Sequence, residues 1–455
     1  MTGTSWAQRI HRLTSGNGLR ANIVRASSAS LALKVINAVL GFAVTVVLAR
    51  TLGPDSFGVY AFALAVIMVV GLPAKAGVPQ LVTRETAKAQ ASGQWGTIRA
   101  VWRWSSLVVL IVSGAVLLCA TAVGFLFPDY FRSESGITLA IGLLMIPLMG
   151  LALVRASSLR GLGHTVQGQL PELAIKPLAF LMLLLGIQFV SNDVLGAPQA
   201  MALNITATAV AFVLGALMLR RARPSVLEQA APVYESRAWL TTIIPMASIN
   251  AMHLINTQAD ILLIGVFMES ADVGQYKVAA QVSLVVAFGL QATKMVAEPY
   301  FARLYHEGEK AKLERLGFGV SLVNSVAAIA VFGFLLIFGL RFLELFFGAG
   351  FEGAYLPLLV LSAGWLVGAW FSASGQLLVM AGFEKRYLRI RVISVVVNLV
   401  LNIALIPTLG LLGAALSTTI SMSVFYYMGW RLARDAVSVD MSLWAILGRS
   451  RPSLG

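Results

Sequence analysis

A run of polar residues inside an apolar segment is the feature of this sequence that could do chemistry. The segment 249–267 reads INAMHLINTQADILLIGVF and holds an acid, an imidazole and several amides. At about 100° per residue on a helix, one face collects five of these side chains within about 120° of arc. They are Asn250, His253, Asn256, Thr257 and Asp260. Such a stripe could bind a cation or a polar ligand, or it could hydrogen-bond neighbouring helices together.

The composition indicates what surrounds this stripe. Of 455 residues, 58% are hydrophobic and 12% are charged, about half the charged fraction of a soluble domain. A membrane span needs about 20 mostly apolar residues. Twelve segments qualify, near 29–50, 57–80, 101–127, 136–158, 168–190, 196–219, 239–268, 273–300, 317–347, 354–382, 388–407 and 409–431. We predict an all-α integral membrane protein with about 12 transmembrane helices.

Basic residues are unevenly distributed between the segments that join these spans. With residue 1 in the cytoplasm, 28 of the 34 Lys and Arg residues fall on the cytoplasmic side and four on the opposite side. The positive-inside rule predicts such an asymmetry, so we expect both termini to be cytoplasmic. The net charge of +14 then reflects topology and attraction to anionic lipid. We expect no nucleic-acid partner, because no groove-reading or base-stacking element is evident.

The chain contains an internal repeat. LGPDSFGVYAFALAV (52–66) aligns with MESADVGQYKVAAQV (268–282) at an offset of 216, which pairs Gly58 with Gly274. Both copies join the first and second spans of a six-span half, so we predict two parallel six-helix lobes, as in alternating-access transporters. The predicted parts are a cytoplasmic N-terminal segment (1–28), an N-lobe of spans 1–6 (29–219), a flexible cytoplasmic linker (220–238), a C-lobe of spans 7–12 (239–431) and a cytoplasmic tail (432–455).

Three stretches carry a resemblance to a known family. ARTLGPDSFGVYAFALAV (49–66), DILLIGVFMESADVGQYKVAAQV (260–282) and GLLGAALSTTI (410–420) resemble bacterial polysaccharide flippases of the O-antigen and capsule type. These belong to the multidrug/oligosaccharidyl-lipid/polysaccharide exporter superfamily. The resemblance implies a V-shaped, MATE-like transporter fold. It also implies that an undecaprenyl-diphosphate-linked oligosaccharide moves from the cytoplasmic to the outer leaflet of the bacterial inner membrane by alternating access.

The acid within the polar stripe is the residue that we connect with ion coupling. An ionised group at mid-membrane costs about 2.5–3.5 kcal/mol on insertion scales, so the stripe should face protein or a water-filled cavity. We expect Asn250, His253, Asn256 and Thr257 to line a cavity or to bond between helices. For Asp260 we favour binding of a proton or Na⁺, and the alternative is a fixed hydrogen bond to an amide on a neighbouring span.

The first lobe offers cations in the corresponding region. Lys34 and Asn37 coincide with Asn250 and His253 under the offset of 216. Lys75 lies in GLPAKAGVPQ, a stretch where proline interrupts the helical hydrogen bonds of the second span. Lysine binds phosphate as a point charge, so Lys34 and Lys75 are candidates for a diphosphate site and Asn37 for a cavity lining. Snorkelling to the membrane surface is the alternative for Lys34.

Further charged residues lie near the ends of predicted spans. Arg155 and Arg160 frame the end of the fourth span and could reach a phosphate, although we favour a topology signal for both. Lys294 and Glu298 are spaced i, i+4, and we predict that they pair with each other.

The absence of several known motifs argues against some classes of function. We find no Gly-x-Ser-x-Gly, Walker A, paired-carboxylate or His-Glu-x-x-His pattern. We therefore predict neither an enzyme nor an ATP-driven transporter, and no cofactor or structural metal. The predicted partners are the lipid-linked oligosaccharide, membrane lipid and assembly proteins such as a polysaccharide polymerase. The alternative function is a cation-coupled small-molecule or multidrug exporter of the same superfamily.

Overall fold

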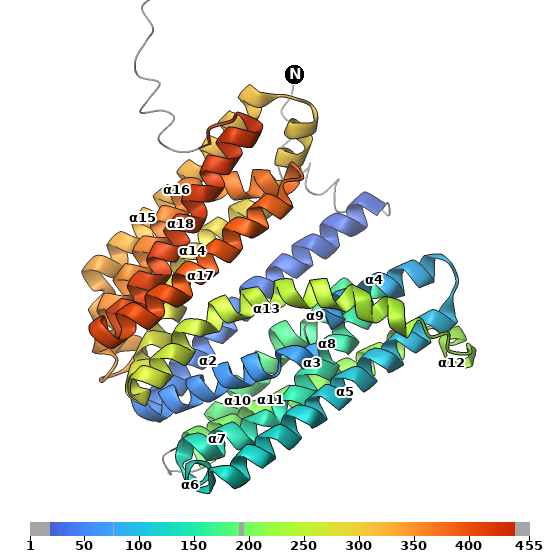
Figure 1. Ribbon diagram of the computed structural model, residues 1–455, viewed down its shortest axis with the longest axis horizontal. Helices are drawn as coiled ribbons and strands as arrows, with labels where there is room; N and C mark the ends of the chain where they lie inside the picture. The colour runs from blue at the N-terminus through green and yellow to red at the C-terminus, as the bar shows by residue number, and fades with distance from the viewer. Residues whose placement is uncertain (1–18, 76, 191–194, 442–455) are drawn as a thin grey trace, which may run out of the picture. The chain divides into compact units, whose positions relative to one another are not determined.

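The computed structural model describes residues 19–75, 77–190 and 195–441, and within these ranges every regular element is helical (Figure 1). The first elements are α2 (Leu19–Val70), α3 (Leu72–Lys75), α4 (Val78–Ala91), α5 (Trp95–Leu126), α6 (Pro128–Arg132), α7 (Glu134–Leu143), α8 (Met145–Gly161), α9 (Thr165–Leu170), a π-helical turn (Pro171–Ile175), α10 (Lys176–Val190), α11 (Ala197–Ala222) and α12 (Val226–Gln229). The others are α13 (Ser236–Phe267), α14 (Ser270–His306), α15 (Lys310–Phe347), a 3₁₀ turn (Glu352–Ala354), α16 (Tyr355–Met380), α17 (Glu384–Leu409) and α18 (Leu411–Val437).

Helices occupy the positions of all the predicted spans. Among the described residues, nine helices are long and apolar enough to cross a membrane. The first of them, Ser28–Val70, is 43 residues long and contains the first predicted span and most of the second. The seventh and eighth predicted spans lie in α13 and α14, helices of 32 and 37 residues that fall outside the nine. The chain is a multi-pass, all-α membrane protein, as the sequence predicted.

The second predicted span is broken where the sequence places proline and glycine. Helix α2 ends at Val70, α3 is a single turn that ends at Lys75, and α4 begins at Val78 after Gly77. Gly77 has a φ of 78°, a left-handed conformation that favours glycine. A Cβ at Gly77 would lie 2.7 Å from the carbonyl oxygen of Ile243 in α13, so glycine also permits this close approach.

The described chain packs as two compact units. The first unit contains the described residues of Met1–Leu52 and Ala63–Leu254, and the second those of Gly53–Phe62 and Ile255–Gly455. Helix α13 therefore begins in the first unit and ends in the second, whereas the predicted C-lobe starts at residue 239. Residues 53–62, which the sequence assigned to the N-lobe, pack with the second unit. The lobe boundaries in the membrane remain a prediction.

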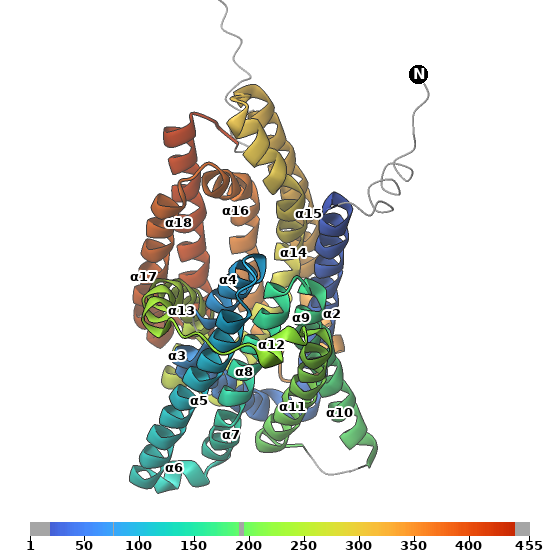
Figure 2. The same ribbon diagram turned by 90° about the vertical axis from the view of Figure 1, so that its right-hand side faces the viewer.

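Within the first unit, α8 contacts α4, α5, α9 and α11, and α10 contacts α11 (Figure 2). The start of α13 joins this unit because its tryptophan is buried there. Trp239 is 1% exposed and packs against Leu81, Ala100 and Val101. Its ring centroid lies 5.4 Å from that of Trp104.

The stretch predicted to be a flexible linker packs against α5. The Arg99 guanidinium donates hydrogen bonds of 2.8 Å to the carbonyl oxygens of Glu228 and Ala230. Leu227 is 4% exposed and belongs to a small apolar cluster with Ile98. The polar composition of the stretch did not reveal the apolar side chain of Leu227 or the two carbonyl groups that Arg99 of α5 binds.

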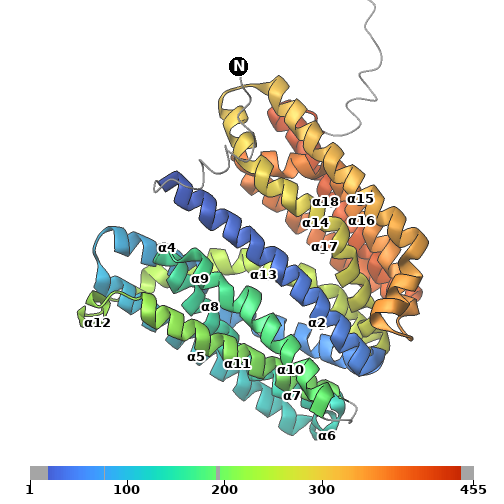
Figure 3. The ribbon, with the colours of Figure 1, turned by 180° about the vertical axis from the view of Figure 1, so that it is seen from behind.

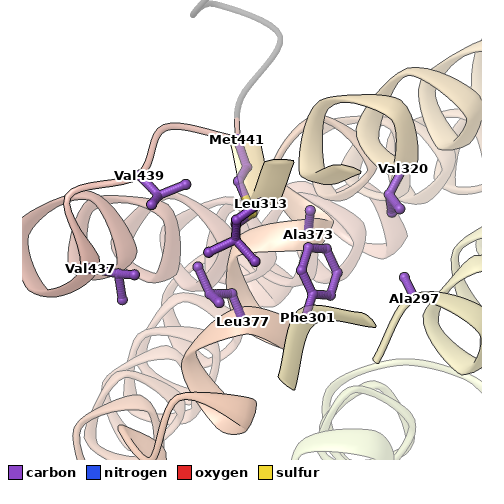
Figure 4. Packing of buried hydrophobic residues seen from close by; sticks show 9 residues of the cluster. All are labelled: Ala297, Phe301, Leu313, Val320, Ala373, Leu377, Val437, Val439 and Met441. Atoms are coloured by element: carbon purple, nitrogen blue, oxygen red, sulfur yellow. The ribbon is translucent and has the colours of Figure 1, made fainter. Parts of the chain in front are cut away.

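The second unit is organised around α16, which contacts α14, α15 and α18, while α17 packs on α18 (Figure 3). One buried apolar cluster joins α14, α15 and α16 to the end of the described chain (Figure 4). Its members are Ala297, Phe301, Leu313, Val320, Ala373, Leu377, Val437, Val439 and Met441. The Ser321 hydroxyl donates to the Met441 carbonyl oxygen at 3.2 Å. Residues up to 441 are therefore part of the packed unit, although the sequence placed the start of a tail at 432.

The two copies of the internal repeat contact each other within the second unit. A Cβ at Gly58 would overlap the Ser270 carbonyl group, and a Cβ at Gly274 would overlap the Pro54 carbonyl oxygen. A Cβ at Gly58 would also lie 3.0 Å from the Gly274 backbone nitrogen. The aligned glycines thus meet at one helix crossing, where small residues allow backbones to approach closely. Gly53, with a φ of 69°, kinks α2 just before this segment.

We expect Gly58→Ala to destabilise the protein, because the added methyl group would force the two repeat copies apart. Overpacking of this kind costs about 1–3 kcal/mol. The measurement is the melting temperature of the purified protein in detergent. Gly41→Ala is the matched control, since it lies on the same helix and a Cβ there meets nothing within 4 Å. Equal melting temperatures for the two variants would contradict the crossing.

Candidate functional site

A hairpin of α17 and α18 presents polar side chains inside the second unit. Gly410, with a φ of 61°, forms the turn between the two helices. A Cβ at Gly413 would overlap the Leu405 carbonyl group, so the helices approach closely at the start of α18. Asn398 and Asn402 are spaced i, i+4 and therefore share one face of α17. Thr418 lies on α18, eight residues after Gly410, and Asn402 lies on α17, eight residues before Gly410.

These side chains converge on the carboxylate of Asp260 in α13. Asp260 Oδ2 accepts hydrogen bonds from the Thr418 hydroxyl at 2.6 Å and from the Tyr276 hydroxyl at 2.7 Å. Asp260 Oδ1 accepts from Asn402 Nδ2 at 2.7 Å and from Asn398 Nδ2 at 3.4 Å. Asn398 Nδ2 also donates to Thr418 Oγ1 at 3.0 Å. One acid thus receives donors from three other helices, and we call these five residues the Asp260 cluster.

Four of the five residues of the Asp260 cluster are buried, and two of its amide oxygens accept no hydrogen bond from the described residues. Asp260 is 8% exposed, Tyr276 2%, Asn398 2% and Asn402 0%. Within the described part of the chain, the Oδ1 atoms of both asparagines are buried and accept no hydrogen bond. An amide can present either its NH₂ or its oxygen after rotation about its terminal bond. The cluster can therefore offer a carboxylate, two amide oxygens and two hydroxyls to a hard cation, and its single negative charge matches a monovalent one.

The structure divides the predicted polar stripe between the two units. Asn250 belongs to the first unit, where its Oδ1 accepts from Gln80 Nε2 at 3.4 Å. Asn256, Thr257 and Asp260 belong to the second. Asn256 Oδ1 is buried and accepts no hydrogen bond from the described residues, whereas the Thr257 side chain is exposed. His253 lies on α13, and its side chain falls outside the described part.

The alternative that the sequence left open for Asp260 is present in the structure. Its carboxylate is held by amides on a neighbouring helix, Asn398 and Asn402 of α17. Helical periodicity placed all five stripe residues on one face of α13. It could not show that only the end of this helix, from Ile255 onward, belongs to the second unit. Ion binding by Asp260 remains a prediction.

The candidate cations of the first unit have different surroundings. Lys75 is partly buried at the end of α3, in the predicted break of the span. It lies close enough to Lys176 for electrostatic repulsion, and Glu172 attracts Lys176. Lys34 is exposed on α2, and Asn37 is partly buried one turn later. Within the described residues, Lys34 and Lys75 share no hydrogen-bond or ion-pair partner.

The two candidate arginines are bound by the protein itself. Arg155 is 4% exposed, and its Nη1 donates to the Ala211 and Phe212 carbonyl oxygens at 2.9 Å. Its Nη2 donates to Glu172 Oε1 at 3.1 Å. Arg160 Nη2 donates to Ser157 Oγ at 2.7 Å. Arg155 therefore ties α8 to α11 through its two terminal nitrogens. Its Nε is buried and donates no hydrogen bond within the described residues. Lys294 and Glu298 pair at 3.7 Å, as predicted.

Sequence reasoning missed four members of the Asp260 cluster. Tyr276 and Thr418 lie in two of the stretches that carried the family resemblance, but neither was selected as a site residue. Asn398 and Asn402 had a visible signal, because two amides spaced i, i+4 in an otherwise apolar span must bond to something. What that partner is depends on the packing of α13 against α17, which no local pattern reveals.

Comparisons with known proteins identify relatives of the chain. The family described as "Polysaccharide biosynthesis protein" matches residues 23–305. "Probable flippase AglR" from Haloferax volcanii is 25% identical over 92% of this chain and 84% of its own length. "Probable low-salt glycan biosynthesis flippase Agl15" from the same organism is 27% identical over 36% of this chain, a match that spans 35% of that relative.

Several solved structures share this fold. An inward-facing multidrug resistance MATE family transporter of the MOP superfamily has a TM-score of 0.73, covering 89% of this chain and 95% of its own, at 15% identity. The lipid II flippase MurJ has a TM-score of 0.69, covering 92% of this chain and 88% of its own, at 13% identity. A MOP superfamily transporter from Pyrococcus furiosus has a TM-score of 0.61, covering 92% and 96% at 15% identity. The predicted MATE-like fold is therefore confirmed.

Proposed function

Because the chain belongs to the family of polysaccharide biosynthesis proteins, we propose that it is a flippase that moves a lipid-linked glycan across a membrane. Two relatives whose names include the word flippase support this activity. A glycan head is too polar to cross the hydrocarbon region unaided, whereas its lipid tail can remain there. The fold, shared with alternating-access transporters, suits such a substrate.

The finer part of the proposal concerns the substrate and its direction. The sequence resemblance favours an undecaprenyl-diphosphate-linked oligosaccharide that moves from the cytoplasmic to the outer leaflet of the inner membrane. The distribution of basic residues favours cytoplasmic termini. Lys75 is our first candidate for the diphosphate, since its helix break and its proximity to Lys176 concentrate positive charge. Lys34 is a second candidate, and Asn37 an accompanying polar residue.

The observation that carries the mechanism is the Asp260 cluster. We propose that a Na⁺ ion or a proton binds there and biases the transporter between its two orientations. A buried carboxylate that neighbouring side chains surround with oxygen atoms can hold Na⁺ directly, or it can hold a proton that is donated to an amide oxygen. The ion must bind the two orientations with different affinity, because equal affinity shifts nothing.

The rival function, export of small molecules or drugs, has the same fold and would use the same kind of ion site. Fold similarity at 13–15% identity therefore does not favour it. The family match over residues 23–305 favours the glycan substrate.

We expect the purified protein in vesicles to move a lipid-diphosphate-linked oligosaccharide between leaflets. The measurement is the fraction of glycan that an added glycosidase can reach, with and without an imposed Na⁺ or proton gradient. A fluorescent cationic drug is the comparison substrate. Movement of the drug but not of the lipid-linked glycan would refute the flippase proposal and favour the exporter.

A further inference from the structure

Helices α5, α8 and α11 enclose a groove in the first unit that the proposed function does not use. Its volume is about 570 Å³, and its lining is mainly apolar. Four arginines also line it, and no acidic side chain does: Arg103, Arg155, Arg220 and Arg223. We call this site the arginine groove.

The charged and apolar residues separate along the arginine groove. Arg103 lies early in α5, whereas Arg220 lies at the end of α11, and these two ends carry the basic residues of both helices. Further along α5, Leu107 and Leu110 line the groove, and on α8 Leu151 does so. Arg103 and Arg220 thus mark one end of the groove, Arg155 lies further along it beside Phe212 and is paired with Glu172, and the rest of the lining is mainly apolar.

The positive charge of the arginine groove is partly neutralised by the protein. Arg155 pairs with Glu172 at 3.1 Å, and Arg223 pairs with Glu228. A Cβ at Gly215 would overlap the Arg155 guanidinium, so α11 crosses directly over that buried charge. After these two ion pairs, the lining retains an excess of positive charge at Arg103 and Arg220.

We propose that the arginine groove binds an anionic phospholipid of the surrounding membrane. Its phosphate would lie at Arg103 and Arg220, and an acyl chain would lie against Leu107 and Leu110. Basic pockets between transmembrane helices bind anionic lipid head groups in this way. Trp102 also lines the groove, and tryptophan favours the depth of lipid head groups.

The lining also argues against the glycan substrate as the occupant. A sugar head presents many hydroxyl groups, and buried hydroxyls need matched donors and acceptors. Apart from the arginines and Trp102, the polar side chains of the lining are Ser106 and Ser158. The lining of the groove therefore matches a small, charged lipid head group better than an oligosaccharide. This inference does not depend on flippase activity, since lipid binding can be measured in a protein that transports nothing.

The test compares two lipids with one acyl composition and different head groups. We expect dioleoylphosphatidylglycerol to raise the melting temperature of the delipidated protein in detergent, and dioleoylphosphatidylcholine to raise it less. Native mass spectrometry should show phosphatidylglycerol retained on the protein. Arg103→Gln and Arg220→Gln should each weaken that retention roughly fivefold, the effect expected for one basic residue near a phosphate. Arg221→Gln is the matched control, because Arg221 is exposed on the same helix and does not line the groove.

A second variant tests the apolar part of the arginine groove. Ala216 lines the groove, and Ala216→Trp should fill it and reduce retention while leaving all four arginines in place. Equal binding of the two lipids, or equal loss in the Arg221→Gln control, would overturn the inference. So would displacement of phosphatidylglycerol by the lipid-linked glycan, since the groove would then belong to the substrate route. Chromatographic profiles of the variants check that each one folds.

Discussion

Asp260→Asn abolishes the response of transport to an ion gradient, and the protein still folds: this is the result we expect. The substitution keeps the size of the side chain but removes its charge. The new amide can still donate to the Thr418 and Tyr276 hydroxyls, because a hydroxyl accepts as well as donates. A monovalent cation then loses the one negative charge of the Asp260 cluster. We expect a loss of at least tenfold in gradient-driven rate, or roughly 1.4 kcal/mol.

The measurement is transport into vesicles with Na⁺ or proton gradients imposed one at a time. In addition, Na⁺ should raise the melting temperature of the unchanged protein if it is the coupling ion, because a ligand that binds only the folded state stabilises it. Asp129→Asn is the control, since Asp129 is exposed on the short helix α6. Gradient-driven transport that survives Asp260→Asn at full rate would make the Asp260 cluster a structural hydrogen-bond network.

Lys75→Met should eliminate export of the polysaccharide, and Lys75→Arg should retain part of it. Methionine preserves the length and apolar stem of the side chain, so the charge is what is tested. Lys75 and Lys176 repel each other in partly buried surroundings, and an anionic diphosphate would relieve that repulsion. Arginine restores the charge with a different donor geometry.

Export is measured as surface polysaccharide in a strain that depends on this chain, together with the amount of protein in the membrane. Lys88→Met is the control, because Lys88 is exposed on α4. Normal export with Lys75→Met would refute the diphosphate role of this lysine. It would leave the coupling proposal intact, since the Asp260 cluster lies in the other compact unit.

The sequence predicted the architecture well because a bilayer imposes strong and local requirements. A span must be apolar over about 20 residues and must satisfy its own backbone, so composition alone locates the helices. The break at Lys75 was also predictable, since proline and glycine act within one or two residues. Local patterns did not reveal the contacts of residues 220–238, where Leu227 is buried and Arg99 donates to two carbonyl oxygens.

For the functional site, too, the sequence revealed the local feature and the structure revealed its partners. Asp260 was recognisable from the sequence, because an acid within an apolar segment needs a partner or a function. Its partners were not, since Tyr276, Asn402 and Thr418 come from three helices up to 158 residues away in the chain. Arg155 is the opposite case. Its position near a span end suggested a phosphate ligand, and only the packing shows that α11 carbonyls and Glu172 bind its two terminal nitrogens.

By itself, the sequence determined the membrane environment, the helical class, the internal repeat and the presence of an acid within an apolar segment. These features follow from the composition and the periodicity of the sequence, which can be read within segments of a few helical turns. Only the tertiary structure decided that the repeat glycines meet at one crossing, that α13 belongs to both compact units, and that Asp260 lies among two amides and two hydroxyls. Those contacts join residues far apart in the chain, and the free energy of packing whole helices, not the preference of any one segment, selects them.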